Sequence, residues 1–125
     1  MGVKHVLVVD DDADMRMLLA SFLQMAGWDV CSADSGQEAL QIASGSSLDA
    51  IMLDTQMPEM DGPQVFRELQ KYGKTKGIPC ILFSSRIEDL DVDKYLKMGF
   101  AGVLPKSFVV GPLVGDISKI LGWSV

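Results

Sequence analysis

Apolar residues follow two alternating patterns along this chain, short continuous runs and stripes with helical spacing. The runs cover residues 5–9, 28–33, 49–54, 78–83 and 101–104. Continuous runs of this length, rich in β-branched residues, are typical of strands buried on both faces of a parallel sheet. Asp29 interrupts the second run, which therefore has the character of an edge strand.

Between the runs, apolar residues recur at spacings of three and four, which predicts amphipathic helices. In the first helix the inward stripe consists of Met15, Leu18, Leu19, Phe22, Leu23 and Ala26. Asp12 or Asp14 is available as its N-cap, and Gly27 ends it. Ser35 to Glu38 form a capping box that opens a second helix, through about Ala43.

Three further helices are predicted in the second half of the chain. One follows Gly62, with Pro63 in its first turn. A polar loop is expected over 71–77, then a less amphipathic helix over 88–98 that Gly99 ends. The last helix packs Val110, Leu113, Val114, Ile117, Ile120 and Leu121.

The result is a strand–helix unit repeated five times, which predicts an α/β fold with a parallel sheet covered by helices on both faces. In such folds ligands bind at the carboxyl ends of the strands. The residues at these ends are Asp10, Asp11, Asp12, Asp34, Asp54, Ser84, Ser85 and Lys106. Polar chemistry is therefore expected along one edge of the sheet.

Three carboxylates, those of Asp10, Asp11 and Asp54, would lie within a few ångströms of one another, and like charges this close resist ionisation. A hard divalent cation such as Mg²⁺ (or Mn²⁺) is the natural compensation, because it binds carboxylate and carbonyl oxygens and often a phosphate oxygen. Lys106 adds one positive charge, which balances the three carboxylates together with the metal.

With its charge neutralised in this way, Asp54 can act as a nucleophile toward phosphorus and form an aspartyl-phosphate. The Ser84 hydroxyl, at the end of the neighbouring strand, is suited to donate to a phosphoryl oxygen. Phosphorylation replaces one charge with roughly two, on three strong acceptor oxygens. We therefore expect it to draw the loops of Ser84 and Lys106 inward.

Each of these residues also has an ordinary structural interpretation when it is considered alone. The aspartates after the first strand could be a solvated helix N-terminus, Asp54 a turn carboxylate, Ser84 a loop residue and Lys106 a surface lysine. Their joint placement at strand ends favours a site. His5, at the opposite end of its strand, is interpreted as a plain strand residue, and the eight methionines as core residues.

Composition narrows the class of protein. The chain has 125 residues, 48% hydrophobic, with a formal net charge of −6. One domain over 1–125 is expected, without an output domain. The acidic charge argues against direct binding to nucleic acid or to an anionic membrane surface. Cys31 and Cys80 are interpreted as reduced thiols of a cytoplasmic protein, since no signal peptide or membrane span is apparent.

These pieces together resemble the receiver domain of two-component response regulators, over essentially the full length of the chain. The resemblance rests on VLVVDDD at 6–12, IMLDTQMPEMDG at 51–62, FSS at 83–85 and Lys106. The segment at 51–62 is the most specific of them. The resemblance implies a flavodoxin-like three-layer sandwich, doubly wound, with five parallel strands in the order 2-1-3-4-5.

The resemblance also implies roles for individual residues. Asp54 would be the phosphoacceptor from a sensor histidine kinase or phosphotransfer protein. Asp11 would bind Mg²⁺ directly, Asp10 mainly through water, and Gln56 through its backbone carbonyl. Ser84 would be the switch hydroxyl and Lys106 the phosphate-binding lysine.

Two further implications concern what happens after phosphorylation. The side chains of Gln56 and Arg86 would flank the water that attacks the phosphoryl group during self-dephosphorylation. A face made by the fourth helix, the fifth strand and the fifth helix would change its affinity for a downstream protein or output domain.

Two positions depart from the family pattern. The family usually has a cis proline after the lysine, whereas Ser107 follows Lys106 here, and a cis bond before a non-proline residue costs ~2.5–4 kcal/mol. This peptide is therefore either strained or trans. An aromatic residue often lies three positions before the lysine, where this chain has Val103. The transmission of phosphorylation is expected to be altered at these two positions.

Other function classes fit the residues less well. A binding module that signals without phosphate is the main alternative, and Val103 and Ser107 motivate it. A haloacid dehalogenase phosphatase would need a second Asp two residues after Asp54, where Gln56 stands, so no turnover of an external substrate is expected. A flavodoxin-like cofactor binder would need a phosphate loop where three aspartates occur.

Overall fold

The five predicted strands form one parallel sheet in a computed structural model that describes residues 3–85, 91–106 and 110–123. The spatial order is β2-β1-β3-β4-β5, which confirms the predicted fold class. The strands are β1 (His5–Val9), β2 (Asp29–Ala33), β3 (Ala50–Asp54), β4 (Cys80–Ser84) and β5 (Gly102–Pro105). β4 begins two residues later than the apolar run predicts, since residues 78 and 79 precede the ladder.

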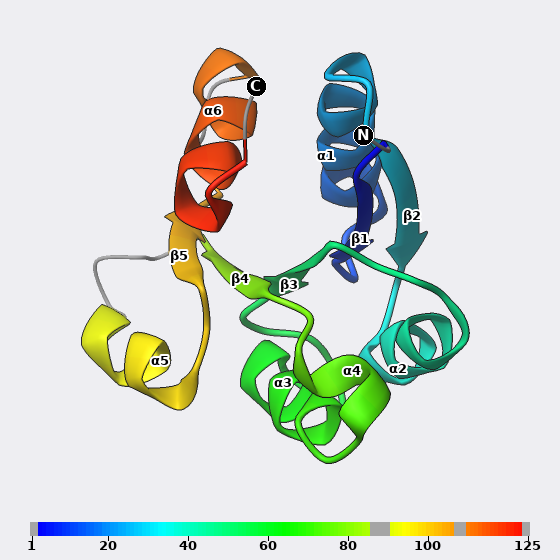
Figure 1. Cartoon of the computed structure of the whole chain (residues 1–125), viewed down its shortest axis with the longest axis vertical. Coiled ribbons are helices and arrows are strands. Elements are labelled where there is room, and N and C mark those ends of the chain that lie inside the picture. Colours follow the sequence, from blue (N-terminus) through cyan, green and yellow to red (C-terminus); the bar gives the residue numbers. More distant parts are fainter. Residues whose placement is uncertain (1–2, 86–90, 107–109, 124–125) are drawn as a thin grey trace.

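Helices cover both faces of the sheet and produce three layers (Figure 1). One face carries α1 (Ala13–Met25) and α6 (Val110–Leu121), and the other carries α2 (Gly36–Gly45), α3 (Gly62–Leu69) and α5 (Val92–Met98). No helix among the described residues is both long and apolar enough to cross a membrane.

Alternate residues of the central strands supply two separate cores, as the two-residue period of a strand requires. Leu7, Ile51 and Leu82 point to the side of α2 and α3. Val8, Met52 and Ile81 point to the side of α1 and α6. Because both faces are filled, every residue of β1, β3 and β4 except His5 at the start of β1 is buried, and polar side chains become accessible only where the strands begin or end.

The helix starts follow the predicted capping chemistry in part. Asp12, rather than Asp14, caps α1 and accepts hydrogen bonds from the backbone N–H groups of Asp14 and Met15. Ser35 caps α2 and accepts from Glu38 N–H, but the Glu38 carboxylate accepts from Asp34 N–H at 2.8 Å, one residue before the position that a capping box requires. These caps fix where each chain segment leaves the sheet edge.

The predicted polar loop over 71–77 is wrong in part, because it contains the short helix α4 (Gly73–Lys76). Thr75 in this turn is 3% exposed, and its hydroxyl donates to Leu69 O at 2.6 Å. A single turn has no apolar period, so nothing in the hydrophobic pattern marks it.

Leu18 is a second correction, because the predicted inward stripe of the first helix includes it and yet it is 45% exposed. The helix packs on the sheet mainly through Leu19 and Leu23, which are fully buried. The predicted stripe is wider than the contact that one flat sheet face can make.

The first residues expected for the helix over 88–98 lie in the segment 86–90, outside the described residues, and α5 is described from Val92. Its end at Gly99 agrees with the prediction, since Gly99 has φ +120°.

Two tryptophans for which the sequence offers no partner pack against each other. The rings of Trp28 and Trp123 meet edge to face at 5.2 Å, and the Lys4 ammonium lies 4.7 Å from the Trp123 ring centroid. This cluster lies at the amino ends of the strands and ties the segment after α6 to the start of β2. It is remote from the edge that carries the aspartates.

Candidate functional site

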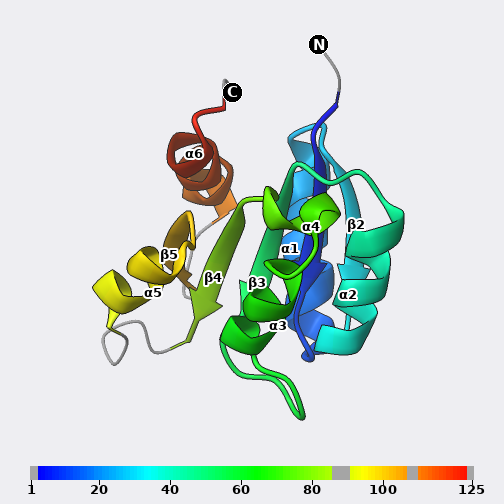
Figure 2. The ribbon, with the colours of Figure 1, turned by 60° about the horizontal axis from the view of Figure 1, so that its bottom comes forward.

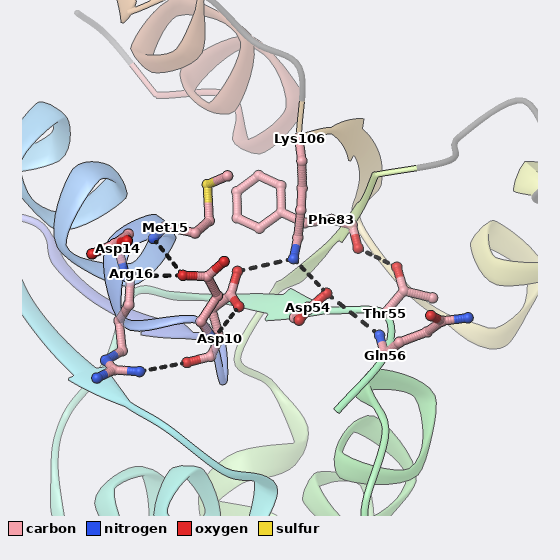
Figure 3. A network of polar contacts seen from close by, with 10 residues as sticks. Asp10, Asp14, Met15, Arg16, Asp54, Thr55, Gln56, Phe83 and Lys106 are labelled. Atoms are coloured by element: carbon pink, nitrogen blue, oxygen red, sulfur yellow. Dashed lines mark hydrogen bonds and ion pairs between the residues drawn. The ribbon is translucent and has the colours of Figure 1, made fainter. Parts of the chain in front are cut away.

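All five strands run toward the same edge, from which the loop between β3 and α3 projects (Figure 2). Asp10 follows β1 directly, Asp54 is the last residue of β3, and Lys106 follows β5. Their side chains converge although they are far apart in the sequence (Figure 3). The structure therefore brings together three of the residues that the strand-end pattern singles out.

Lys106 bridges two buried carboxylates. Its Nζ lies 3.0 Å from Asp10 Oδ2 and 2.9 Å from Asp54 Oδ1. Asp10 is 0% exposed and Asp54 is 3% exposed, whereas the lysine side chain is 16% exposed. One ammonium group thus faces two negative charges in a place that water barely reaches.

Asp10 is held on several sides. Its N–H donates to Ala33 O at 3.1 Å, and its Oδ1 accepts from Asp12 N–H at 2.9 Å. Apart from the ion pair with Lys106, its buried Oδ2 has no polar partner among the described residues. That oxygen therefore has spare capacity to accept a further ligand.

Asp11 completes the acidic group. One carboxylate oxygen from each of Asp10, Asp11 and Asp54 lies within 4.8 Å of the others, and Asp11 is exposed. Three carboxylate oxygens at this spacing suit a hard divalent cation. The residues fit a magnesium site that opens to solvent on the side of Asp11.

The electrostatics of Asp54 are dominated by its burial. Burial raises the pKa of Asp54 to about 6; the hydrogen bond from Lys106 lowers it, and the negative charge of Asp10 raises it. Burial by itself lowers the pKa of Lys106, but the hydrogen bonds to Asp54 and Asp10 outweigh it, so the net pKa lies above its usual range. The lysine therefore stays charged, and it compensates only part of the cost of burying Asp54.

Thr55, to which the sequence pattern assigns no role, anchors the loop after β3. Its N–H donates to Phe83 O at 2.8 Å, and its hydroxyl donates to the same oxygen. This carbonyl directly precedes Ser84. A hydroxyl-bearing residue directly after the central Asp is the signal in the sequence that could have drawn attention to it.

Gly62 permits the chain to turn back tightly against β3. Its N–H donates to Thr55 O at 3.1 Å, and a Cβ at this position would overlap with Asp54 O. A residue without a side chain is required here by this close approach. The loop between β3 and α3 thus packs directly against the backbone at Asp54.

The remaining predicted residues lie around this centre. Ser84 is buried at the end of β4, and its carbonyl accepts from Lys106 N–H at 2.8 Å. Gln56 is exposed, and its N–H donates to Asp54 Oδ1 at 3.4 Å. Its side chain extends away from Asp54 (Figure 3). Val103 lies opposite Leu82 in the sheet and packs, partly buried, on the core beside α3.

Arg86 and Ser107 lie outside the described residues, so their predicted roles stay predictions. The same holds for the conformation of the peptide between Lys106 and Ser107. The metal-binding carbonyl of Gln56 and the switch role of Ser84 are likewise predictions that geometry alone does not test.

Comparison with known proteins places this site in a family. Residues 6–118 match the response regulator receiver domain. The chain belongs to the response regulator receiver family. Receiver domains interact with histidine kinases in two-component signalling. The matched region includes the three clustered aspartates and the lysine described above, namely Asp10, Asp11, Asp54 and Lys106.

Curated receiver-containing relatives extend beyond the matched region. The transcriptional regulatory protein CpxR homolog of Haemophilus influenzae is 34% identical over 119 residues, which is 95% of this chain and 51% of the relative. The transcriptional regulatory protein PrrA of Mycobacterium tuberculosis is 36% identical over 117 residues, 94% of this chain and 49% of the relative. The chain thus spans about half the length of these relatives.

Solved receiver structures share the fold over nearly the whole chain. Chemotaxis protein CheY4 of Vibrio cholerae superposes with a TM-score of 0.86 at 27% identity, covering 95% of this chain and 99% of that one. Response regulator TrrA of Thermotoga maritima, solved in complex with Mg²⁺ and BeF, gives a TM-score of 0.79 at 30% identity, covering 94% and 99%.

Proposed function

We propose that this receiver domain accepts a phosphoryl group on Asp54 from a sensor histidine kinase or a phosphotransfer protein. The observation that carries the proposal is the convergence of Asp10, Asp11, Asp54 and Lys106 at the carboxyl edge of the sheet. In the transfer, a carboxylate oxygen of Asp54 forms a bond to phosphorus while the bond from phosphorus to the donor nitrogen breaks.

The proposed cofactor is Mg²⁺ or Mn²⁺, which would be held by Asp10, Asp11, Asp54 and the backbone carbonyl of Gln56. When bound, the metal supplies positive charge that neutralises the transferring phosphoryl oxygens. The acidic cluster of this chain and the Mg²⁺ and BeF bound by the relative TrrA support this assignment. The protein contributes position, because the fully buried β3 fixes the backbone of Asp54.

Lys106 and Ser84 would respond to the new group. Lys106 Nζ pairs with Asp54 Oδ1. Once Asp54 carries a phosphoryl group, this ammonium would pair with a phosphoryl oxygen in place of the carboxylate. Ser84, on the next strand, would donate its hydroxyl to another. Gln56 and Arg86 would flank the water in self-dephosphorylation, with no turnover of an external substrate.

The consequence would be a changed affinity of the face made by α5, β5 and α6, which corresponds to the predicted fourth helix, fifth strand and fifth helix. Its partner would be a downstream protein or an output domain, as in the transcriptional regulators to which the chain is similar. Coupling of this kind typically amounts to ~1–3 kcal/mol. A cytoplasmic location is part of the proposal.

The test is phosphorylation by acetyl phosphate with MgCl₂, read by intact-protein mass spectrometry. Wild type should gain one phosphoryl group, and Asp54→Asn should gain none. Asp93→Asn, which removes an exposed carboxylate from α5, is the matched control and should label like wild type. Equal labelling of wild type and Asp54→Asn would refute the proposal.

A second candidate is a binding module whose partner affinity does not depend on phosphate. The small, partly buried Val103 in place of an aromatic residue favours it, because no large side chain there could change its burial. Adding beryllofluoride and MgCl₂, a mimic of the phosphoryl group, distinguishes the two. A severalfold change in partner affinity would eliminate this candidate.

A further inference from the structure

Arg16 on α1 reaches back to the end of β1. Its Nη1 donates to the backbone carbonyl of Asp10 at 2.8 Å, and its side chain is half-buried. Figure 3 shows the guanidinium approaching Asp10 from the side opposite Lys106. The hydrophobic pattern assigns this residue no role, since it belongs neither to the predicted helix stripe nor to a strand end.

The carbonyl that Arg16 binds lies just beyond the β1–β3 ladder, which ends at the pair of Val9 and Leu53. A buried carbonyl in this place needs a donor from elsewhere. A guanidinium N–H supplies a charge-assisted bond, stronger than a neutral one.

The oxygen concerned belongs to the peptide that joins Asp10 to Asp11. Asp12 follows this peptide in the chain. Its N–H donates to Asp10 Oδ1, and its carbonyl accepts from Arg16 N–H at 2.9 Å. α1 therefore fixes the aspartate run through both the backbone and the side chain of Arg16. Asp10 and Asp11, which supply two of the three clustered carboxylates, flank this peptide, so its orientation constrains where both side chains start.

We propose that Arg16 is a positioning residue that holds Asp10 and Asp11 in the geometry that binds the divalent cation. The inference rests on the proposed function in one respect, that the acidic cluster is a metal site. Arg16 itself is not expected to contact the metal or the phosphoryl group.

The positive charge of Arg16 and its hydrogen bond to the Asp10 carbonyl predict opposite changes in cation affinity when the arginine is replaced. Removing a positive charge near the cluster should by itself strengthen cation binding, because like charges repel. Removing the bond that fixes the peptide should weaken it. Loss of such supporting partners typically costs 10–100-fold in metal affinity.

The experiment is a titration of the full chain with MgCl₂ alone, followed by the amide ¹H–¹⁵N NMR signals of the β1–α1 and β3–α3 loops. Arg16→Gln should bind Mg²⁺ at least about tenfold more weakly than wild type. Arg16→Lys, which keeps the charge but not the planar fork, should lose a smaller factor. Arg67→Gln, which removes the same charge from the exposed side of α3, should bind as wild type does.

Unchanged or tighter Mg²⁺ binding by Arg16→Gln would overturn the proposal. Dispersed NMR spectra establish that a variant is folded, and if Arg16→Gln is not, Arg16→Lys decides by the same criterion. Acetyl phosphate labelling of wild type separates the two claims. If wild type binds Mg²⁺ but is not labelled on Asp54, the proposed function fails while the role of Arg16 is still measured.

Discussion

The end of β3 and the helix α5 are held in very different ways. All five residues of β3 are buried, and the loop behind Asp54 is bound through Thr55 and Gly62. None of the seven residues of α5 is buried. The site is therefore built at the end of a fully buried strand, whereas α5 contacts the core only through partly buried side chains, among them Tyr95 and Met98.

A short chain of aromatic rings contributes to the attachment of α5, together with the partly buried Met98. The Tyr95 ring meets the Phe100 ring edge to face at 6.1 Å, and Phe100 stacks on Phe66 of α3 at 4.2 Å. Ring contacts of this kind contribute ~0.5–1.5 kcal/mol each beyond their area. This is comparable with the free energy that allosteric coupling typically supplies. If phosphorylation changes the site as proposed, we therefore expect α5 to shift more readily than the fully buried β3.

The largest expected effect concerns the charge buried at the end of β3. Because the folded-state pKa of Asp54 is about 6 against an ordinary value of 3.8, its contribution to stability is full below pH 3.8 and is lost as the pH rises through 6. Asp54→Asn has no such loss. Without metal, its unfolding free energy relative to wild type should rise between pH 4 and pH 8, by at most about 3 kcal/mol.

Urea unfolding at the two pH values measures this difference, and Asp93→Asn serves as the exposed control. MgCl₂ should reduce the difference, because a bound cation lowers the pKa of Asp54. If wild type and Asp54→Asn show the same pH dependence, the burial cost assigned to β3 is wrong.

The next effect concerns the backbone contact behind Asp54. Gly62→Ala places a methyl group against Asp54 O, and overpacking of this kind typically costs about 1–3 kcal/mol. Gly115→Ala in α6 is the matched control, because a Cβ there meets nothing within 4 Å beyond its chain neighbours and the backbone of its own helix. That control should instead stabilise the domain by about 0.5–1 kcal/mol, as alanine does in a helix. Thermal unfolding of both variants distinguishes a contact effect from a general glycine effect.

A smaller effect is expected at Thr55. Thr55→Val keeps the shape but removes the hydroxyl that donates to Phe83 O, which should cost about 1 kcal/mol. Because this carbonyl precedes Ser84, acetyl phosphate labelling should also slow. Thr55→Ser, which restores the hydroxyl, should recover the labelling rate. Failure of the serine variant to recover it would place the effect in packing instead.

The smallest effect is expected on α5. Leu96 is 43% exposed, so Leu96→Ala should change the unfolding free energy by less than about 0.5 kcal/mol. The buried Leu69 in α3 is the comparison, since Leu69→Ala should cost about 2–5 kcal/mol. Similar losses at the two positions would remove the contrast between the constrained and the weakly held parts of the molecule.

The sequence by itself determined the five strands, their burial and the gathering of polar residues at one edge. These features follow from local periodicity and from the rule that parallel strands end at the same edge, so the strand-end pattern alone groups Asp10, Asp54 and Lys106. The cap at Ser35 was predictable, and that of the first helix down to a choice between Asp12 and Asp14, because a cap bonds residues only two or three positions away.

Only the tertiary structure decided which groups bond to which across the sheet edge. Three interactions depend on how separate segments lie in space. They are the ion pairs of Lys106 with two aspartates, the hydrogen bond from Arg16 to the Asp10 carbonyl and the hydrogen bond from Thr55 to Phe83 O. The outward position of Leu18 and the single turn of α4 were decided in the same way, by the shape of the packed face and by one buried hydroxyl. Periodicity records which side of an element is apolar, but not the partner that side meets.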